Sequence, residues 1–176
     1  MNIRLAKCRY NNYCYRVSRT LRKEIRQKKP FGSPQQELFL EIQRTADVLM
    51  RGLEELLKPS GLTQTQYNVL RILRGAGPNG RTCREVANRM ITHDPDVTRL
   101  LDRLESRQLI ERRRGEGDRR VIRVRITPGG LKLLASLDQL VADLHGRQLG
   151  HLGNENLCQM INSMEETRLS LIGKAP

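Results

Sequence analysis

Aromatic side chains are scarce in this sequence, which has four tyrosines, two phenylalanines and no tryptophan. Proteins that bind single-stranded nucleic acid depend on aromatic side chains on which the bases stack, so the composition argues against that class. No apolar run approaches the ~20 residues that a membrane-spanning helix needs, and the basic N-terminal stretch lacks the apolar core of a secretory signal. We therefore expect neither a membrane-spanning chain nor a secreted one.

Residues that carry catalysis or bind metal ions are also few. The four cysteines and three histidines form no CxxC or HExxH motif and no zinc-ribbon or disulfide spacing, and no catalytic triad, carboxylate pair or glycine-rich phosphate loop is visible. The sequence therefore predicts no metal site, no cofactor and no enzymatic activity. Cys83 is the exception, because it lies between Arg81 and Arg84 near an expected helix start, where positive charge favours a reactive thiolate. Redox sensing and plain capping or packing both stay open for this thiol.

Positive charge is abundant but unevenly placed. The formal net charge of +13 points to a polyanionic partner or a membrane surface. Residues 1–30 hold ten Lys and Arg and one acidic residue, whereas residues 31–176 hold twenty-two and eighteen. Residues 1–32 are therefore expected to be a flexible basic extension, whose composition suits a nucleic-acid-binding arm, a transit peptide or residues upstream of the true start. In the rest of the chain the charge gathers at 99–125, with ten arginines and five acids.

Apolar side chains recur every three or four residues along most of the chain after residue 33, a spacing that is typical of amphipathic helices. The expected helices cover 33–57, 63–74, 82–90, 94–107, 127–144 and 157–169. Ser33, Thr63 and Thr127 are the expected N-caps of three of them. Asp94 followed by Pro95 marks the expected start of the fourth helix, which would be ~14 residues long.

Two short strands joined by a polar tip are expected after the fourth helix. The strand candidates are residues 109–114 and 121–126, and residues 115–120 between them hold two glycines. Because apolar residues alternate with arginines in the second strand, one of its faces should pack against the protein. The residues expected on that face are Ile122, Val124 and Ile126. A short helix, a turn, a capped helix and a basic hairpin together predict a mainly α fold with a small β-hairpin wing, the winged helix-turn-helix.

The predicted fold suits double-stranded DNA. The exposed start of a helix fits the ~12 Å major groove and brings side chains to base edges, and arginines on a hairpin can reach the minor groove. Thr98 and Arg99, near the start of the fourth helix, are the candidates for base contacts, and Arg103 is a candidate for a phosphate contact. On the wing we expect Arg112 and Arg114 to face the duplex, because three consecutive arginines cannot all point to one side of a strand.

Three segments of the sequence resemble the MarR family of bacterial transcription regulators. They are LTQTQYNVL at 62–70, VTRLLDRLESRQLIERR at 97–113 and DRRVIRVRITPGG at 118–130. The segments occur in the family's order and at its separations, and the resemblance covers roughly 33–172. It implies a winged helix-turn-helix domain at 61–127 and a helical dimerisation region. The dimerisation region would consist of residues 33–60 and 128–174.

The resemblance also implies a function. A homodimer would bind a palindromic operator in double-stranded DNA, in the bacterial cytoplasm and associated with the nucleoid, as a repressor that a small aromatic or phenolic effector releases. By the family's pattern, Arg119 and Arg120 would lie at the wing tip, with Arg120 in the minor groove and Asp118 orienting it through a charge-assisted hydrogen bond. The alternative is an architectural or RNA-binding protein with little sequence preference, which the basic composition also suits.

One position departs from the family's pattern. Gln108 stands where the family usually has glycine, at the turn that leaves the recognition helix. A left-handed backbone at this turn would cost a residue with a Cβ atom on the order of 1 kcal/mol. We therefore expect the turn to be slightly reshaped in this protein.

Overall fold

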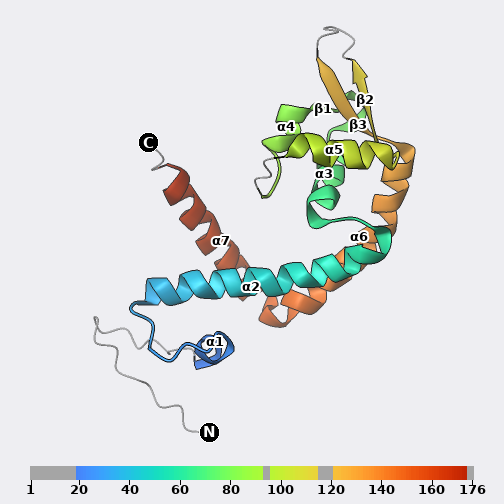
Figure 1. Cartoon of the computed structure of the whole chain (residues 1–176). Coiled ribbons are helices and arrows are strands. Elements are labelled where there is room, and N and C mark those ends of the chain that lie inside the picture. The colour runs from blue at the N-terminus through green and yellow to red at the C-terminus, as the bar shows by residue number, and fades with distance from the viewer. Residues whose placement is uncertain (1–18, 93–95, 115–120, 174–176) are drawn as a thin grey trace. The chain divides into compact units, whose positions relative to one another are not determined.

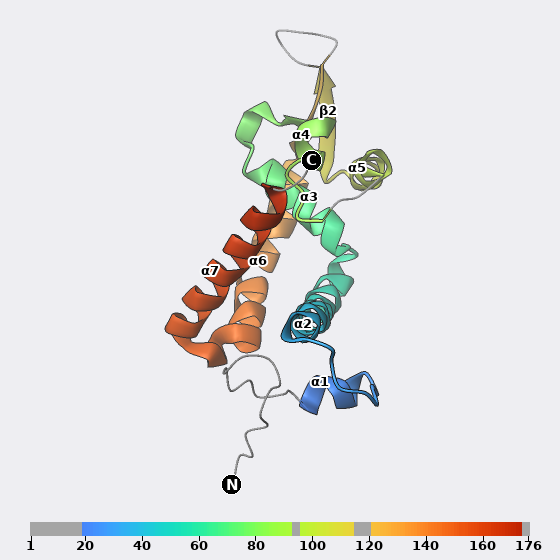
Figure 2. The same cartoon turned by 90° about the vertical axis from the view of Figure 1, so that its left-hand side faces the viewer.

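The computed structural model describes residues 19–92, 96–114 and 121–173, which belong to two compact units, residues 1–48 and 49–176. The first unit holds α1 (Arg19–Glu24) and most of α2 (Pro34–Leu57). The second unit holds the end of α2 followed by η1 (Lys58–Ser60), α3 (Gln64–Arg74), η2 (Gly77–Asn79), β1 (Arg81–Thr82), α4 (Cys83–Ala87), α5 (Val97–Ser106), β2 (Ile110–Arg114), β3 (Ile122–Ile126), α6 (Pro128–Leu149), η3 (Gly150–Leu152) and α7 (Gly153–Ile172). The mainly α fold with a small β-hairpin wing is confirmed, and both views show the hairpin projecting from α3, α4 and α5 (Figure 1, Figure 2).

The first unit contains a helix that the sequence did not predict. In α1 the side chain of Leu21 is only 2% exposed, and Glu24 accepts a hydrogen bond from Nε of Arg44 on α2 at 3.1 Å. Within this unit, α2 begins as expected, because Oγ of Ser33 accepts a hydrogen bond from the backbone N–H of Gln36 at 3.2 Å.

The core of the second unit is built from the apolar stripes that the sequence predicted. The buried stripe of α3 consists of Tyr67, Val69, Leu70 and Leu73, and that of α5 of Val97, Leu100, Leu101 and Leu104. Val86 of α4, Leu134 and Leu137 of α6 and Val124 of β3 belong to the same cluster. Burial of one such side chain contributes roughly 1.5–3 kcal/mol. The helix-turn-helix, the wing and the start of α6 are therefore held around one core.

The sheet has three antiparallel strands in the order β1-β3-β2, one strand more than the hairpin that we expected. The short β1 pairs with β3, with Arg81 opposite Val124, and so ties the start of α4 to the wing. Of the predicted packed face of β3, Val124 is 1% exposed, but the prediction is wrong for Ile122, which is 54% exposed. Ile122 pairs with Arg114 at the last position of the β2–β3 ladder, whereas Val124 lies two residues further along β3 and belongs to the hydrophobic core.

The N-terminal caps of the helices follow the sequence with one correction. Thr63 and Thr127 cap α3 and α6 as predicted. The predicted cap of α5 is wrong: Asp96 takes this place, accepting a hydrogen bond from the backbone N–H of Arg99 at 3.2 Å, and Asp94 lies outside the described residues. The helix therefore has 10 residues and starts at Val97, the first residue of its buried stripe. Burial of that stripe thus selects the second of two nearby aspartates as the cap.

Thr82 and Glu85 form a reciprocal capping box at the start of α4. Oε2 of Glu85 accepts hydrogen bonds from the backbone N–H of Thr82 at 2.8 Å and from its hydroxyl at 3.0 Å. These bonds, with help from the charges of Arg81 and Arg123, hold the pKa of Glu85 below its ordinary value of 4.5. The ionised carboxylate is therefore favoured in the folded state.

This lowered pKa makes the stability of α4 depend on pH. The contribution of ionised Glu85 is complete above its ordinary pKa of 4.5 and is lost as the pH falls through the lower pKa of the folded state. Glu85→Gln keeps a capping side chain but cannot titrate. We expect urea denaturation to show wild type more stable than Glu85→Gln at pH 7 and the difference to shrink below pH 4.5. A difference that is the same at pH 7 and pH 3 would contradict this linkage.

The turn after α5 is not reshaped, contrary to our expectation, because Gln108 has the left-handed φ of 57°. The backbone N–H of Leu109 donates to the carbonyl of Leu104 at 3.1 Å, and that of Gln108 donates to the carbonyl of Glu105 at 2.8 Å. This is the pair of hydrogen bonds that ends a helix in a Schellman motif, whose left-handed position is usually glycine. Burial of Leu104 and Leu109 in the core holds the turn in place although a Cβ atom is present.

We expect Gln108→Gly to stabilise the protein by about 1 kcal/mol, since it removes the cost of a left-handed backbone with a Cβ atom. Gln108→Ala is the matched control, because alanine keeps the Cβ atom and should leave the free energy of unfolding almost unchanged. Chemical denaturation of wild type and the two variants measures both effects. Equal stability of Gln108→Gly and Gln108→Ala would show that the turn carries no strain.

Candidate nucleic-acid interface

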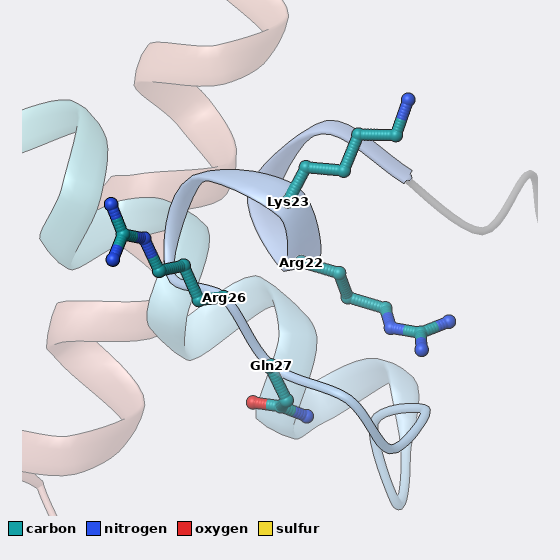
Figure 3. A pocket seen from close by; sticks show the side chains of 4 residues that line it. All are labelled: Arg22, Lys23, Arg26 and Gln27. Carbon is teal, nitrogen blue, oxygen red and sulfur yellow. The ribbon is translucent and has the colours of Figure 1, made fainter.

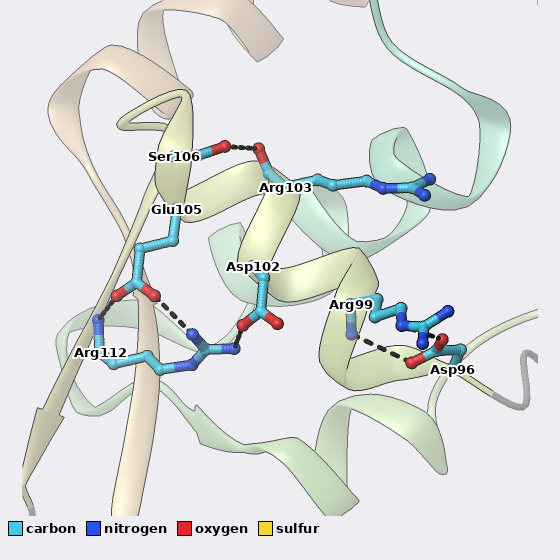
Figure 4. A network of polar contacts seen from close by, with 7 residues as sticks. All are labelled: Asp96, Arg99, Asp102, Arg103, Glu105, Ser106 and Arg112. Carbon is cyan, nitrogen blue, oxygen red and sulfur yellow. Dashed lines mark hydrogen bonds and ion pairs between the residues drawn. The ribbon is translucent and has the colours of Figure 1, made fainter.

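The start of α5 exposes the two residues that were predicted to contact bases. Thr98 and Arg99 both lie on the surface, and the Arg99 side chain is 79% exposed. Besides capping the helix, Asp96 places Oδ2 at 3.1 Å from Nε of Arg99 (Figure 4). One aspartate thus fixes the first turn of the helix and holds the arginine beside it. A carboxylate that accepts from Nε leaves the two terminal nitrogens of the guanidinium for another acceptor.

Arg103 lies one turn further along α5 and is exposed. Residues four apart share a helix face, so Arg103 follows Arg99 on one face, while Asp102 follows Thr98 on the adjacent one. The structure therefore groups the three α5 residues of the predicted site at one exposed surface of the helix.

Arg112 of β2, which the sequence analysis expected to face the duplex, is paired with two carboxylates of α5. Its side chain is 26% exposed, and its Nη2 lies 2.6 Å from Oδ1 of Asp102 while its Nη1 contacts Oε2 of Glu105 (Figure 4). Burial lowers the pKa of Arg112, but the hydrogen bond to Asp102 and the charge of Glu105 outweigh it, so the pKa is raised above its ordinary value. The structure thus joins Arg112 to α5, a contact that the sequence analysis missed.

The other wing residues are described in part. Arg113 pairs with Glu111 on its own strand at 2.8 Å. Arg114 is exposed at the end of β2. Because residues two apart point to the same side of a strand, Arg114 lies on the same side of β2 as Arg112. The predicted tip residues Asp118, Arg119 and Arg120 lie outside the described residues, so their roles at the minor groove remain predictions.

Arg107 at the end of α5 has a structural role that the sequence analysis did not predict. Its Nη1 donates to the carbonyl oxygen of Gly61 at 2.6 Å and its Nη2 to that of Ser60 at 2.8 Å. The guanidinium thereby fastens the end of α5 to the corner between α2 and α3, where Gly61 has a left-handed φ of 64°. No local pattern could have revealed this contact, because its partners lie 46 and 47 residues away along the chain.

Cys83 is the first residue of α4, directly after the cap Thr82. Its thiol is half-buried, and the side chain packs against the hydrophobic core. This packing supports the structural role among the two that the sequence left open, and redox sensing stays a prediction. Cys158 on α7 is exposed.

Surface hollows occur in both units. A hollow of about 510 Å³ in the second unit lies beside the α2–α3 corner. It is lined by Glu54, Glu55, Lys58, Gly61, Leu62, Thr63, Gln64 and Thr65. A hollow of about 330 Å³ belongs to the first unit, and Figure 3 shows its cationic residues Arg22, Lys23 and Arg26 pointing in different directions. Those three side chains do not converge on one ligand.

Several known proteins resemble this chain in sequence or in fold. Residues 62–122 match the model of the MarR family. The uncharacterized HTH-type transcriptional regulator YwoH of Bacillus subtilis is 35% identical over 82 residues, which is 47% of this chain and 58% of that protein. The crystal structure of a MarR transcription factor from Planctomyces limnophilus is 42% identical, with a TM-score of 0.60 and coverage of 77% of this chain and 98% of that one. This chain belongs to the MarR family.

The MarR family is one of transcription regulators rather than enzymes, and the resemblance drawn from the sequence is confirmed. A MarR mutant from E. coli, solved in complex with operator DNA, is 28% identical, with a TM-score of 0.68 and coverage of 74% of this chain and 93% of that one. Among the residues that the structure describes, no helix is both long and apolar enough to span a bilayer.

Proposed function

We propose that this MarR-family regulator acts as a homodimer on a palindromic operator in double-stranded DNA. The observation that carries the proposal is the exposed start of α5, where Asp96 caps the helix and holds Arg99 beside Thr98. In a two-fold dimer, two such helix starts enter major grooves about one duplex turn apart. The E. coli relative was solved in complex with operator DNA, which supports operator DNA as the partner. Cytoplasmic residence and association with the nucleoid follow from such a role.

Dimerisation is assigned to residues 33–60 and 128–174, as the sequence suggested, with 61–127 as the DNA-binding domain. Within the first unit, α2 exposes Leu38, Phe39 and Ile42, and within the second unit, α7 exposes a series of large apolar side chains. Those of α7 are Met160, Ile161, Leu169, Leu171 and Ile172. Apolar surface of this extent on a soluble regulator is typical of an interface, and a second copy of the chain is the partner that an operator palindrome requires.

Regulation by a small aromatic or phenolic effector, with release of a repressor from its operator, is the final part of the proposal. The hollow beside the α2–α3 corner is the candidate effector site. Its rim includes Gly61, whose carbonyl accepts a hydrogen bond from Arg107 at the end of α5. A ligand that prefers one position of this corner would shift the population of recognition-helix positions.

The test is a comparison of duplexes at one salt concentration. Purified protein is titrated with DNA from upstream of its own gene and with a shuffled duplex of the same length and composition. We expect an affinity difference of at least about 10³-fold, the usual lower bound for specific recognition. Equal affinity on both duplexes would favour the alternative of an architectural or RNA-binding protein with little sequence preference.

A further inference from the structure

The wing strand β2 is an edge strand of its sheet, and α5 covers part of that edge. Edge strands present backbone groups that lack a partner strand. Here the backbone N–H of Arg112 donates to Oε1 of Glu105 at 3.1 Å, while the guanidinium of the same residue contacts the other oxygen of Glu105. Asp102 accepts from the second arm of the guanidinium at 2.6 Å. Figure 4 shows both carboxylates of α5 turned toward Arg112.

The two carboxylates lie on the helix that is proposed to enter the major groove. Asp102 lies four residues after Thr98 and is 54% exposed, so its negative charge would face phosphates whenever α5 approaches DNA. Arg112 is the cation that is placed against both acids. A planar guanidinium can bind two carboxylates at fixed angles, which a lysine ammonium cannot do with the same geometry.

We infer that Arg112 is a positioning residue of the DNA-binding surface rather than a direct DNA contact. Its guanidinium locks the wing to α5 and neutralises Asp102 and Glu105, so that the recognition helix approaches DNA without two uncompensated negative charges. This inference rests on the proposed function, because it assigns a role in the same interface. A direct phosphate contact would require the guanidinium to leave both carboxylates, whose charges would then repel the same phosphates.

The test compares operator affinity for four proteins: wild type, Arg112→Met, the triple variant that adds Asp102→Asn and Glu105→Gln, and the control Arg113→Met. We expect Arg112→Met to lose about tenfold in affinity, because it exposes the two acids to the phosphates. The triple variant should recover to within about threefold of wild type, since its acids are neutral. Arg113→Met removes an arginine from the same strand whose ion pair is local to β2, and it should lose less than Arg112→Met.

The salt dependence separates the two roles of Arg112. If Arg112 contacts a phosphate directly, the triple variant stays as weak as Arg112→Met, and the slope of log affinity against log salt falls by about 0.9 per subunit. That result, or unchanged affinity of Arg112→Met, would overturn the inference.

A measurement without DNA keeps the inference testable if the proposed function fails. Hydrogen exchange at the Arg112 amide should be faster in Glu105→Ala than in wild type, because the carboxylate protects this edge N–H. Unchanged exchange would show that the contact between α5 and the wing is not formed in solution. Absence of specific DNA binding by wild type, with protected exchange, would instead count against the proposed function alone.

Discussion

Replacing Gly130 by alanine is expected to destabilise the protein by about 3 kcal/mol, the largest effect on stability that we predict. Gly130 is buried in the first turn of α6, and a Cβ atom there would lie 2.3 Å from the carbonyl oxygen of Leu109 and 2.7 Å from Cγ1 of Ile126. The Leu109 carbonyl cannot move away freely, because it accepts a hydrogen bond from the backbone N–H of Thr127 at 3.1 Å. The methyl group therefore forces α6 away from the base of the wing.

Gly129→Ala is the matched control, one residue earlier in the same helix. Its Cβ atom would meet only Oγ1 of Thr127 at 3.6 Å and the carbonyl oxygen of Gln108 at 3.7 Å, which are ordinary contacts. Alanine is the better helix former, so this variant should gain roughly 0.5–1 kcal/mol. Thermal unfolding should show a midpoint about 6–12 °C lower for Gly130→Ala. Similar midpoints for the two variants would mean that α6 does not approach Leu109 as closely as described.

Arg99→Ala is expected to weaken operator binding by roughly 10- to 100-fold and to relax the choice of base at one position in each half-site. A side chain that donates two hydrogen bonds to a guanine contributes about 1–3 kcal/mol of discrimination. The exposed Arg99 is suited to this contact, because Asp96 holds Nε and leaves the two terminal nitrogens for the base. Titration of operators with single base-pair substitutions measures the loss at each position.

Arg103→Ala, compared with Arg99→Ala, distinguishes a phosphate contact from a base contact made by the same helix. Since Arg103 is proposed to contact phosphate, its loss should weaken binding about equally on every sequence and lower the salt slope by about 0.9 per subunit. For Arg99→Ala we expect the reverse, a sequence-dependent loss. A uniform loss in both variants would place Arg99 on the DNA backbone and leave Thr98 as the remaining candidate for base contact.

The features of the fold that depend on neighbours within one helical turn were predicted from the sequence. The buried stripe of α5 from Val97 to Leu104 and the caps Thr63 and Thr127 occur where the spacing indicated. The sequence indicated that a left-handed backbone at Gln108 would be unfavourable, but it could not show that the protein adopts this backbone. Packing of Leu104 and Leu109 in the core holds the left-handed backbone there.

The candidate site was predicted only in part, because exposure and partnership are not local properties. Thr98, Arg99 and Arg103 could be placed on an exposed face from helical periodicity alone. The same reasoning assigned Arg112 to DNA, although the tertiary structure turns it toward Asp102 and Glu105. A run of three arginines carries no information on which of them meets a carboxylate of another element.

The sequence by itself determined the order of the elements from α2 to α7 apart from β1, the buried faces of α3 and α5 and the family, since these follow from periodicity, capping residues and motifs within short windows. Only the tertiary structure decided that β1 joins the wing and that Asp96 caps α5. It also decided that Arg107 fastens the end of α5 to the α2–α3 corner and that Arg112 joins the wing to α5. The physical reason is that these contacts depend on how buried surfaces bring distant segments together, which no local preference specifies.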